Sequence, residues 1–480
     1  MYKNKKIHLI GIGGISMSGI AEILLDNGAI ISGSDIAKNK AITTLQEKGA
    51  NIIIGENKDL IKDADIVIYT QAINEANEEL KEAKKLNKEI YERSVFLGLL
   101  TKNYKNVICI SGTHGKSTTT GMISTCFINA KKNPTIQIGA YLPIINANYK
   151  IGSKDYFIME ACEYKDSFLH FFPTKEVILN IDDDHLDYFK NMEGVINSYN
   201  KYVNRLPQNG SLIINNDDEN IKKLNLRNDL KILTYGINND AMCTAKNIIK
   251  DDFNKYSFDI FYNNELFLNI KLNVLGIHNI YNALATTLIC IDSGLNKKDI
   301  KAGIESYKGV ERRFEFIGTY KENILVYDDY AHHPTEIKST LDSAKSIKCH
   351  KNWAIFQSHT YSRTIEHLND FANVLKDFDN IIIAPIYPAR ETNIWGVKET
   401  DLCDLIKPHN KNVYYIDSFK KIVDFLKNNL EENDLVITIG AGPINEVGID
   451  LLKKDWFFNP FFYIVISTAP FNLILSNNKY

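Results

Sequence analysis

A glycine-rich turn between a predicted strand and a predicted helix constrains this chain more than any other feature. Residues 107–126 read Val-Ile-Cys-Ile-Ser-Gly-Thr-His-Gly-Lys-Ser-Thr-Thr-Thr-Gly-Met-Ile-Ser-Thr-Cys. Residues 107–110 form an apolar run typical of a buried strand, and a helix-compatible stretch follows the turn at 112–117. Glycines let backbone N–H groups approach phosphate oxygens, and a helix start favours negative charge. The turn therefore predicts a nucleoside-triphosphate site, with Lys116 at the β- and γ-phosphates and the Ser117 hydroxyl on Mg²⁺.

The match to the general phosphate-loop pattern is incomplete. G-x-x-x-x-G-K-[ST] requires glycine at position 110, where this chain has Ile110, so the turn is the shorter G-x-x-G-K-S. A turn with a purely structural role is the alternative interpretation. The position after a buried strand and before a helix favours the phosphate site.

The length of the chain and its apolar runs predict three α/β domains and a tail. A chain of 480 residues suggests about three domains. We expect their bounds at 1–104, 105–309 and 310–455, followed by a tail of unknown role at 456–480. The longest unbroken apolar run of the tail, residues 461–466, is far shorter than the roughly 20 residues of a spanning helix. We therefore expect no stable membrane insertion.

Charge and cysteine content exclude several classes of function. The net charge is −3 at pH 7 and the lysines are scattered, which argues against a nucleic-acid surface. The seven cysteines form no C-x-x-C pair, so neither a disulfide framework nor a structural zinc site is expected. The first residues run directly into a predicted strand, so we expect no signal peptide. These features favour a reducing cytoplasm.

The first segment predicts a Rossmann-like parallel sheet. Apolar runs at 7–12, 30–34, 51–54, 66–69 and 89–91 alternate with helical patterns. The first turn, residues 11–16, approximates the dinucleotide fingerprint, with Ser16 where the third glycine is expected. Asp35 follows the second run at about the distance of a ribose-binding acid. A bound nucleotide diphosphate is the favoured interpretation, and a tight turn that packs strand on helix is the alternative.

The second segment predicts a metal site beside the phosphate loop. Glu160 ends a predicted buried strand at 156–160, and Asp182-Asp183-Asp184-His185 follows another at 177–181. Carboxylates and an imidazole at neighbouring strand ends suit a divalent cation that nucleotide phosphates also bind. A solvated acidic turn explains the three aspartates equally well, whereas ligation is the favoured role of His185.

The remainder of the second segment predicts a small flanking sheet and a helix. Short strands are expected at 212–215, 230–235, 256–261 and 266–274. His278 and Asn279 open the apolar helix that follows, where they either cap the helix or contact a base.

The third segment predicts another mostly parallel sheet with polar clusters at its carboxyl edge. Strands are expected at 324–327, 353–357, 381–385, 413–416 and 435–439. The polar clusters lie at 312–313, 328–334, 358–363 and 440–442. Because carboxyl ends of parallel strands form the ligand-binding edge of such sheets, these clusters predict a site there.

In this order, these pieces resemble the Mur ligases. The resemblance runs from about Lys6 to Lys453, and it is carried by residues 8–14, 32–35, 112–120, 160–164, 180–188, 276–283, 312–314, 328–334 and 356–363. It implies an α/β fold of three domains: an N-terminal Rossmann-like domain that binds the UDP-sugar, a central ATPase of phosphate-loop type, and a C-terminal Rossmann-like domain.

The resemblance also implies an activity. It indicates a cytoplasmic, ATP-dependent amide ligase of peptidoglycan precursor synthesis that joins L-alanine to the lactyl carboxylate of UDP-N-acetylmuramate through an acyl phosphate. The implied cofactors are ATP and Mg²⁺, with Mn²⁺ as an alternative, and the partners are these two small-molecule substrates. A ligase that attaches a preformed peptide to the same sugar nucleotide is the nearest rival. A nicotinamide-dependent oxidoreductase and a non-catalytic nucleotide-binding protein are more distant alternatives.

Implied roles follow position by position. The catalytic residues implied are Lys116, Glu160, His185, Arg313, His332 and Arg363. The residues implied to contact ATP are Gly112, Thr113, His114, Gly115, Lys116, Ser117, Thr118, His278, Asn279, Asn282, Arg313, Asp328 and Tyr330. Gly11, Gly13, Gly14, Ser16 and Asp35 would hold the sugar nucleotide, and His359 and Arg363 the amino acid. Ser117, Glu160 and His185 would bind metal.

Three positions depart from the family pattern. Ser117 stands where threonine is frequent, Gln71 where serine is frequent, and Pro443 where an acidic or amide residue is usual. The first change keeps the hydroxyl, and the other two affect expected uridine and C-terminal contacts. The base that deprotonates the amine is open, with His332 a candidate on residue type, and so are the oligomeric state and the strictness for alanine.

Overall fold

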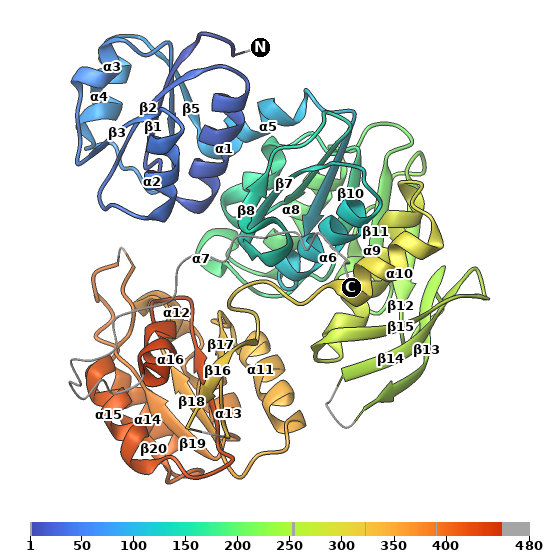
Figure 1. Cartoon of the computed structure of the whole chain (residues 1–480), viewed down its shortest axis with the longest axis vertical. Helices are drawn as coiled ribbons and strands as arrows, with labels where there is room; N and C mark the ends of the chain where they lie inside the picture. Colours follow the sequence, from blue (N-terminus) through green and yellow to red (C-terminus); the bar gives the residue numbers. More distant parts are fainter. Residues whose placement is uncertain (1, 252–254, 322, 390, 454–480) are drawn as a thin grey trace, which may run out of the picture.

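The chain folds into three α/β bodies, each built on its own sheet. The computed structural model describes residues 2–251, 255–321, 323–389 and 391–453 (Figure 1). The tail interpreted above at 456–480 lies outside the described residues. None of the helices in the described ranges is long and apolar enough to cross a bilayer.

The N-terminal body is a five-stranded parallel sheet in the order β3-β2-β1-β4-β5. Its elements are β1 Lys6–Ile10, α1 Ile15–Asp26, β2 Ile30–Asp35, α2 Lys40–Glu47, β3 Asn51–Ile54, α3 Asp59–Lys62, β4 Ile66–Tyr69, α4 Glu78–Lys85, β5 Glu89–Glu92 and α5 Arg93–Thr101. The side chains of Asn39 and Asn77 accept backbone N–H groups at the starts of α2 and α4, where such caps are favoured. The predicted parallel sheet is confirmed.

The central body is one ten-stranded mixed sheet in the order β15-β14-β13-β12-β11-β10-β6-β9-β7-β8. Its first half comprises β6 Asn106–Ser111, α6 Lys116–Asn129, β7 Thr135–Leu142, η1 Pro143–Ile145, β8 Ala147–Lys150, β9 Tyr156–Glu160, η2 Tyr164–His170, β10 Lys175–Ile178, α7 Leu186–Phe189 and α8 Met192–Val203. Its second half comprises β11 Ser211–Asn215, η3 Ile221–Lys223, β12 Lys231–Gly236, β13 Cys243–Lys250, β14 Lys255–Tyr262, β15 Glu265–Leu275, α9 His278–Asp292 and α10 Lys297–Ser306.

The strands expected to form a separate flanking sheet extend the central sheet instead. The link is short, because β12 pairs with β13 only at Tyr235 with Cys243 and Gly236 with Thr244. From β13 onwards the pairing is antiparallel. Strand β6 lies between β10 and β9 in the sheet. Five of its six residues are buried, so its side chains are covered on both faces of the sheet, which accounts for the apolar run.

The C-terminal body is a six-stranded sheet in the order β16-β17-β21-β18-β19-β20. Its elements are β16 Glu315–Tyr320, β17 Ile324–Asp329, α11 Pro334–Ser346, β18 Asn352–Phe356, α12 Tyr361–Glu366, α13 Leu368–Leu375, β19 Asn380–Ile383, α14 Glu399–Ile406, β20 Val413–Tyr415, α15 Phe419–Asn429, β21 Leu435–Ile439 and α16 Asn445–Leu452. All strand pairs are parallel except β16 with β17. The apolar pattern did not predict β16, which lies at the edge of the sheet.

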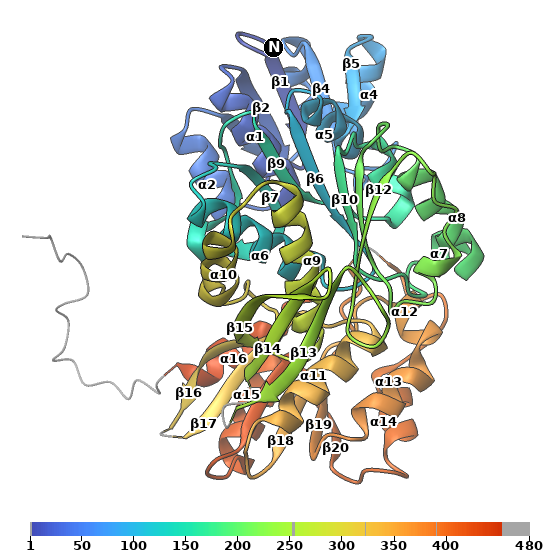
Figure 2. The same cartoon turned by 90° about the vertical axis from the view of Figure 1, so that its right-hand side faces the viewer.

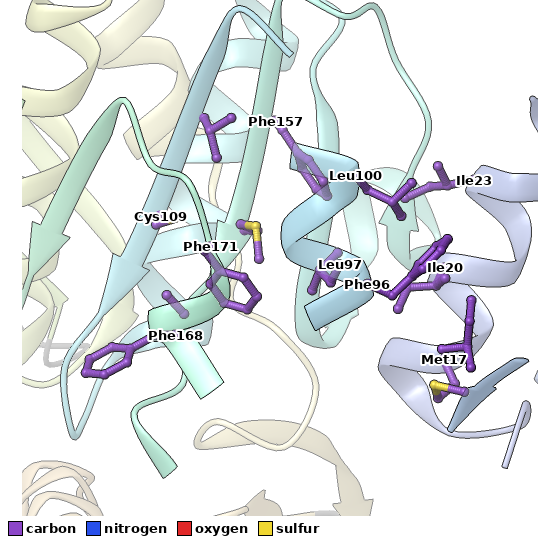
Figure 3. Close-up of a cluster of buried hydrophobic side chains, with 14 of the residues drawn as sticks. Met17, Ile20, Ile23, Phe96, Leu97, Leu100, Cys109, Phe157, Phe168 and Phe171 are labelled. Atoms are coloured by element: carbon purple, nitrogen blue, oxygen red, sulfur yellow. The ribbon is translucent and has the colours of Figure 1, made fainter. Parts of the chain in front are cut away.

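One hydrophobic core continues from the N-terminal body into the central body. Figure 3 shows α5 between α1, which contributes Met17, Ile20 and Ile23, and the central side chains Phe157, Phe168 and Phe171. Phe96 and Leu97 of α5 are buried in the same cluster. Elsewhere in the described chain, no hydrophobic cluster joins the central body to the C-terminal one.

Gly98 is required for the close approach of α5 to η2. A Cβ atom at Gly98 would stand 2.0 Å from the carbonyl oxygen of His170. We expect Gly98→Ala to destabilise the folded chain by about 1–3 kcal/mol, because the two backbones must separate. Gly19→Ala, on helix α1 with its nearest neighbour at 3.4 Å, is the matched control. Thermal unfolding followed by circular dichroism compares the two, and equal midpoints would show that the contact is not tight.

Candidate active site

The phosphate loop joins the buried strand β6 to α6 as predicted. Gly112 and Gly115 have φ of +131° and +84°, a backbone region that side chains disfavour. A Cβ at Gly115 would also lie 3.0 Å from Oδ1 of Asn282 on α9, so the loop lies directly against that helix. The Asn180 side chain stabilises the loop, because its Oδ1 accepts a hydrogen bond from the backbone N–H of His114 at 2.8 Å.

Lys116 folds back over its own loop. Its Nζ donates to the carbonyl oxygens of Gly112 at 2.5 Å and Thr113 at 3.0 Å, and it lies 3.3 Å from Oε2 of Glu163. Burial alone would lower the pKa of Lys116, but nearby carboxylates, Glu163 first, raise it above its ordinary value. Lys116 is therefore a charged ammonium at neutral pH, held beside a buried carboxylate.

A cavity of about 960 Å³ opens between the central and C-terminal bodies, next to this loop. It is lined by His114, Gly115, Thr118, His278, Asn279 and Asn282 from the central body, and by Arg313, Asp329, Thr335, Glu336 and Ser339 from the C-terminal side. Its size suits a nucleotide-sized ligand. Three of the predicted loop residues therefore line the same cavity as the start of α9 and Arg313. The other predicted loop residues, Gly112, Thr113, Lys116 and Ser117, are not part of its lining.

The start of α9 is held by its own side chains. Nδ2 of Asn279 donates to the Leu275 carbonyl at 2.6 Å, and Nδ2 of Asn282 donates to Oδ1 of Asn279 at 2.9 Å. Nδ1 of His278 lies 2.8 Å from the Ser339 hydroxyl on α11 of the C-terminal body. His278 therefore contributes to the junction of the two bodies as well as to the cavity wall.

Two residues of the C-terminal body that were expected to contact ATP, Asp328 and Tyr330, lie outside the cavity lining, so their nucleotide roles stay predictions. Asp328 does not line the cavity, because its carboxylate accepts Nε of Arg312 at 2.8 Å and the Thr438 hydroxyl at 2.6 Å. The next residue, Asp329, lines the cavity, and burial raises its pKa to about 7. Tyr330 is also absent from the cavity lining, since its ring packs against the guanidinium groups of Arg312 and Arg313.

The residues expected to bind metal lie at neighbouring strand ends. Glu160 ends β9 and the segment before His185 follows β10, and both strands pair with β6 beside the loop that carries Ser117. Oε1 of Glu160 accepts the Gly139 N–H at 2.6 Å, and the His185 ring packs on Tyr164 with centroids 4.5 Å apart. Hydroxyl and carboxylate oxygens are ligands that Mg²⁺ prefers. A further buried carboxylate oxygen, Oε1 of Glu163, has no hydrogen-bond partner among the described residues, which fits a nearby cation.

A second polar cluster joins the loop to the C-terminal body. His114 Nε2 lies 3.1 Å from Oδ2 of Asp182, and the Thr335 hydroxyl donates to the same oxygen at 3.0 Å. His114, Asp182 and His333 offer ligand atoms that all lie within 4.8 Å of one another. Burial would lower the pKa of His114, but hydrogen bonds to Asp182 and Glu336 raise it to about 9. An imidazolium paired with two carboxylates therefore accounts for this cluster.

The residues expected to bind the amino acid or accept its proton come from the C-terminal body, near Asp184 of the central body. Nη2 of Arg363 donates to Oδ1 of Asp184 at 2.9 Å, so the pair bridges the central and C-terminal bodies. The rings of His332 and His359 lie with centroids 6.1 Å apart, and burial lowers the pKa of each to about 4. Both imidazoles are therefore neutral at pH 7, as a proton acceptor must be.

The first glycine turn lies in the N-terminal body, on a different sheet from the phosphate loop. Gly11 has φ of +79°, and the Gly13 N–H donates to Oδ2 of Asp35 at 2.8 Å. Helix α1 begins after Gly14 with no side-chain cap, which leaves its N-terminus available to an anion. Ser16 accepts hydrogen bonds from Nη1 of Arg93 at 3.1 Å and Nε2 of Gln137 at 2.6 Å.

Comparison with known proteins identifies the family. Three models match along the chain: the catalytic domain of the Mur ligase family at 6–105, the Mur ligase middle domain at 110–290, and the Mur ligase glutamate ligase domain at 312–442. A UDP-N-acetylmuramate–L-alanine ligase of Clostridium botulinum is 47% identical over 446 residues, covering 93% of this chain and 97% of the relative. The chain belongs to the Mur ligase family. The corresponding ligase of Acetivibrio thermocellus is 44% identical over 452 residues, covering 94% of this Mur ligase and 96% of the relative.

Solved structures share the fold of this Mur ligase. The UDP-N-acetylmuramate–alanine ligase of Thermotoga maritima superposes with a TM-score of 0.79 at 26% identity, covering 93% of this chain and 98% of that one. A murein peptide ligase of Psychrobacter arcticus superposes with a TM-score of 0.70 at 23% identity, covering 94% and 98%. The predicted family and three-part α/β fold are thus confirmed, while the exact domain bounds stay a prediction.

Several polar side chains of this Mur ligase were not singled out as site residues from the sequence. They are Arg93 at the first glycine turn, Glu163 beside Lys116, Asp329 in the cavity, and Glu336 between the two bodies. Asp329 and Glu163 lay within or beside quoted motifs, so their position was a usable signal. No motif marked Glu336 or Arg93.

Proposed function

We propose that this Mur ligase joins L-alanine to the lactyl carboxylate of UDP-N-acetylmuramate with conversion of ATP to ADP and phosphate. The observation that carries the proposal is the alignment, along nearly the whole of both chains, with curated relatives named for that reaction. The cavity beside the phosphate loop supports it, because an ATP-dependent ligase needs such a site. A cytoplasmic location fits a reaction that consumes ATP.

The phosphate loop would hold ATP. A carboxylate is a poor acyl donor, and transfer of the γ-phosphoryl group to it gives an acyl phosphate whose leaving group is phosphate. Lys116 would leave the loop carbonyls and neutralise charge on the transferring group. Mg²⁺ held by Ser117, Glu160 and His185 would supply further charge neutralisation there.

The C-terminal body would supply the amino-acid site. The Arg363 guanidinium is a fitting partner for the α-carboxylate of alanine, which would replace or join Asp184. His332 or His359, both neutral, would accept a proton from the amine as it attacks the acyl phosphate. Arg313 would stabilise the nucleotide from the C-terminal wall of the cavity, and closure of the C-terminal body would exclude water from the site.

The N-terminal body would hold the UDP moiety. The uncapped start of α1, with Gly11, Gly13 and Gly14 before it, suits a diphosphate, and Asp35 braces the turn through Gly13. Arg93 adds a cation next to Ser16. A nicotinamide-dependent oxidoreductase would leave the phosphate loop of the central body without a role.

Phosphate release from Mg-ATP tests the proposal. Release should require UDP-N-acetylmuramate and be fastest with L-alanine, compared with L-serine, glycine and the tripeptide L-Ala-γ-D-Glu-diamino acid offered separately. Tripeptide-dependent release would instead support a peptide-attaching ligase, the activity named for the Psychrobacter arcticus structure. No release with any acceptor would refute both.

A further inference from the structure

Glu336 lies where three parts of the site meet. It is the third residue of α11, and its side chain is 13% exposed. Its Oε1 lies 3.4 Å from Nδ1 of His114 and 3.5 Å from Nη1 of Arg313. Its Oε2 accepts the backbone N–H of His332 at 3.0 Å and lies 3.3 Å from the ring Nδ1 of the same residue.

The contacts of Glu336 link segments with separate expected roles. His114 belongs to the phosphate loop, Arg313 to the cavity wall, and His332 to the amino-acid side. His114 is in the central body and the other two are in the C-terminal body, so this set exists only when the bodies meet. No other carboxylate in the described chain lies within hydrogen-bonding or ion-pairing distance of all three.

The charge on Glu336 is needed for these contacts. A buried carboxylate is costly unless cations or donors surround it. Burial would raise the pKa of Glu336, but the neighbouring His332, His114 and Arg313 hold it well below the ordinary value. The ionised carboxylate can therefore fix the orientation of the His114 imidazolium and the Arg313 guanidinium together.

We propose that Glu336 is a positioning residue that couples the nucleotide site to the amino-acid site when the C-terminal body closes on the central one. Its carboxylate orients His114 and Arg313 around the nucleotide phosphates and holds the backbone of His332 at the acceptor. The inference rests on the proposed ligase reaction and adds to it a residue that does not touch the reacting atoms.

A helix cap is the structural alternative. Glu336 occupies the third position of α11 and accepts a backbone N–H from the residue before the N-cap, as acidic residues at helix starts commonly do. Glutamine keeps one acceptor oxygen for that N–H but removes the charge that His114 and Arg313 face. Glu336→Gln therefore separates the cap from the coupling role.

The matched control is Asp401→Asn. Asp401 is the third residue of α14, and its Oδ2 accepts the Lys398 N–H at 2.8 Å, so it caps a helix of the same body without lining the cavity. We expect the two variants to unfold at similar temperatures. Glu336→Gln alone should lower kcat for L-alanine-dependent phosphate release by about 30-fold, since hydrogen bonds to charged groups are lost.

Two further readouts separate the inference from the reaction. The KM for UDP-N-acetylmuramate should stay within about twofold of the control, whereas affinity for Mg-AMP-PNP, measured calorimetrically, should fall about tenfold. If Glu336→Gln matches Asp401→Asn in kcat and in nucleotide affinity, Glu336 is only a cap and the inference is overturned. If the unaltered protein binds Mg-AMP-PNP but never releases phosphate, the proposed function fails, and nucleotide affinity alone then decides on Glu336.

Discussion

Lys116→Ala is expected to abolish acyl-phosphate formation while binding of the UDP-sugar persists. Lys116 is the charged group that the phosphate loop itself carries, and its Nζ now rests on two loop carbonyls and on Glu163. Removing the ammonium leaves the charge of the transferring phosphoryl group without its main protein partner. Loss of one such preorganised group lowers kcat by about 10²–10³-fold, and we expect at least that decrease.

Sugar-nucleotide binding should not change, because the first glycine turn lies in the N-terminal body on a different sheet. Acyl phosphate is measured by trapping with borohydride or hydroxylamine, and binding of UDP-N-acetylmuramate by calorimetry. Lys105→Ala, an exposed lysine of the same body that pairs with Asp155, is the control. An unchanged rate of acyl-phosphate formation in the Lys116→Ala protein would contradict the assignment of this loop to ATP.

Arg363→Ala should mainly raise the KM for the amino acid. The Arg363 guanidinium is the cation of the C-terminal body that reaches across to the central body, where it meets Asp184 at 2.9 Å. We expect loss of a charge-assisted contact to the alanine carboxylate to raise this KM by about 100-fold, with the KM for ATP nearly unchanged. Initial rates of phosphate release at varied L-alanine and varied ATP provide both values.

Arg227→Ala is the control for this second experiment. Arg227 also pairs with an aspartate, Asp229, through Nε and Nη2, but it lies away from the cavity lining. Because Arg363→Ala also leaves Asp184 buried without its partner, the double change with Asp184→Asn tests whether that charge causes the defect. A variant in which only the KM for ATP moved would show that Arg363 serves the nucleotide instead.

The sequence predicted the fold well where local pattern and global structure agree. The apolar run at 107–110 predicted β6 correctly, because the residues of this strand are buried. The glycines at 112 and 115 adopt the positive φ that the turn requires. The edge strand β16 was missed because a half-exposed strand lacks a continuous apolar run. The prediction of a separate flanking sheet was wrong, because the pairing of β12 with β13 involves only two residues of each strand and leaves no signal in the sequence.

The candidate site shows a similar limit. Motif position singled out Arg313 and Arg363, which both lie at the junction of the central and C-terminal bodies, but it did not resolve which of two neighbouring aspartates faces the cavity. The difference depends on Arg312, whose guanidinium donates a hydrogen bond to Asp328, whereas Asp329 lines the cavity wall. Glu336 could not be found from spacing, because two of its three partners, His114 and Arg313, are 222 and 23 residues away in the chain.

The two junctions of the molecule differ in kind, and that difference bears on how a product leaves. Figure 2 shows the N-terminal body at one end of the molecule and the C-terminal body at the other. Around α5 the first two bodies bury apolar side chains in one shared core. Exposing this surface to water would cost free energy, so we expect the two bodies to move together as one rigid unit. The other junction is made of hydrogen bonds and ion pairs such as Arg363 with Asp184 and Ser339 with His278, which water can replace on both faces. In the proposed reaction, we therefore expect the C-terminal body to move away from the central body at small free-energy cost after each turnover. This movement would free ADP and the lengthened sugar nucleotide without disturbing the core shared by the first two bodies.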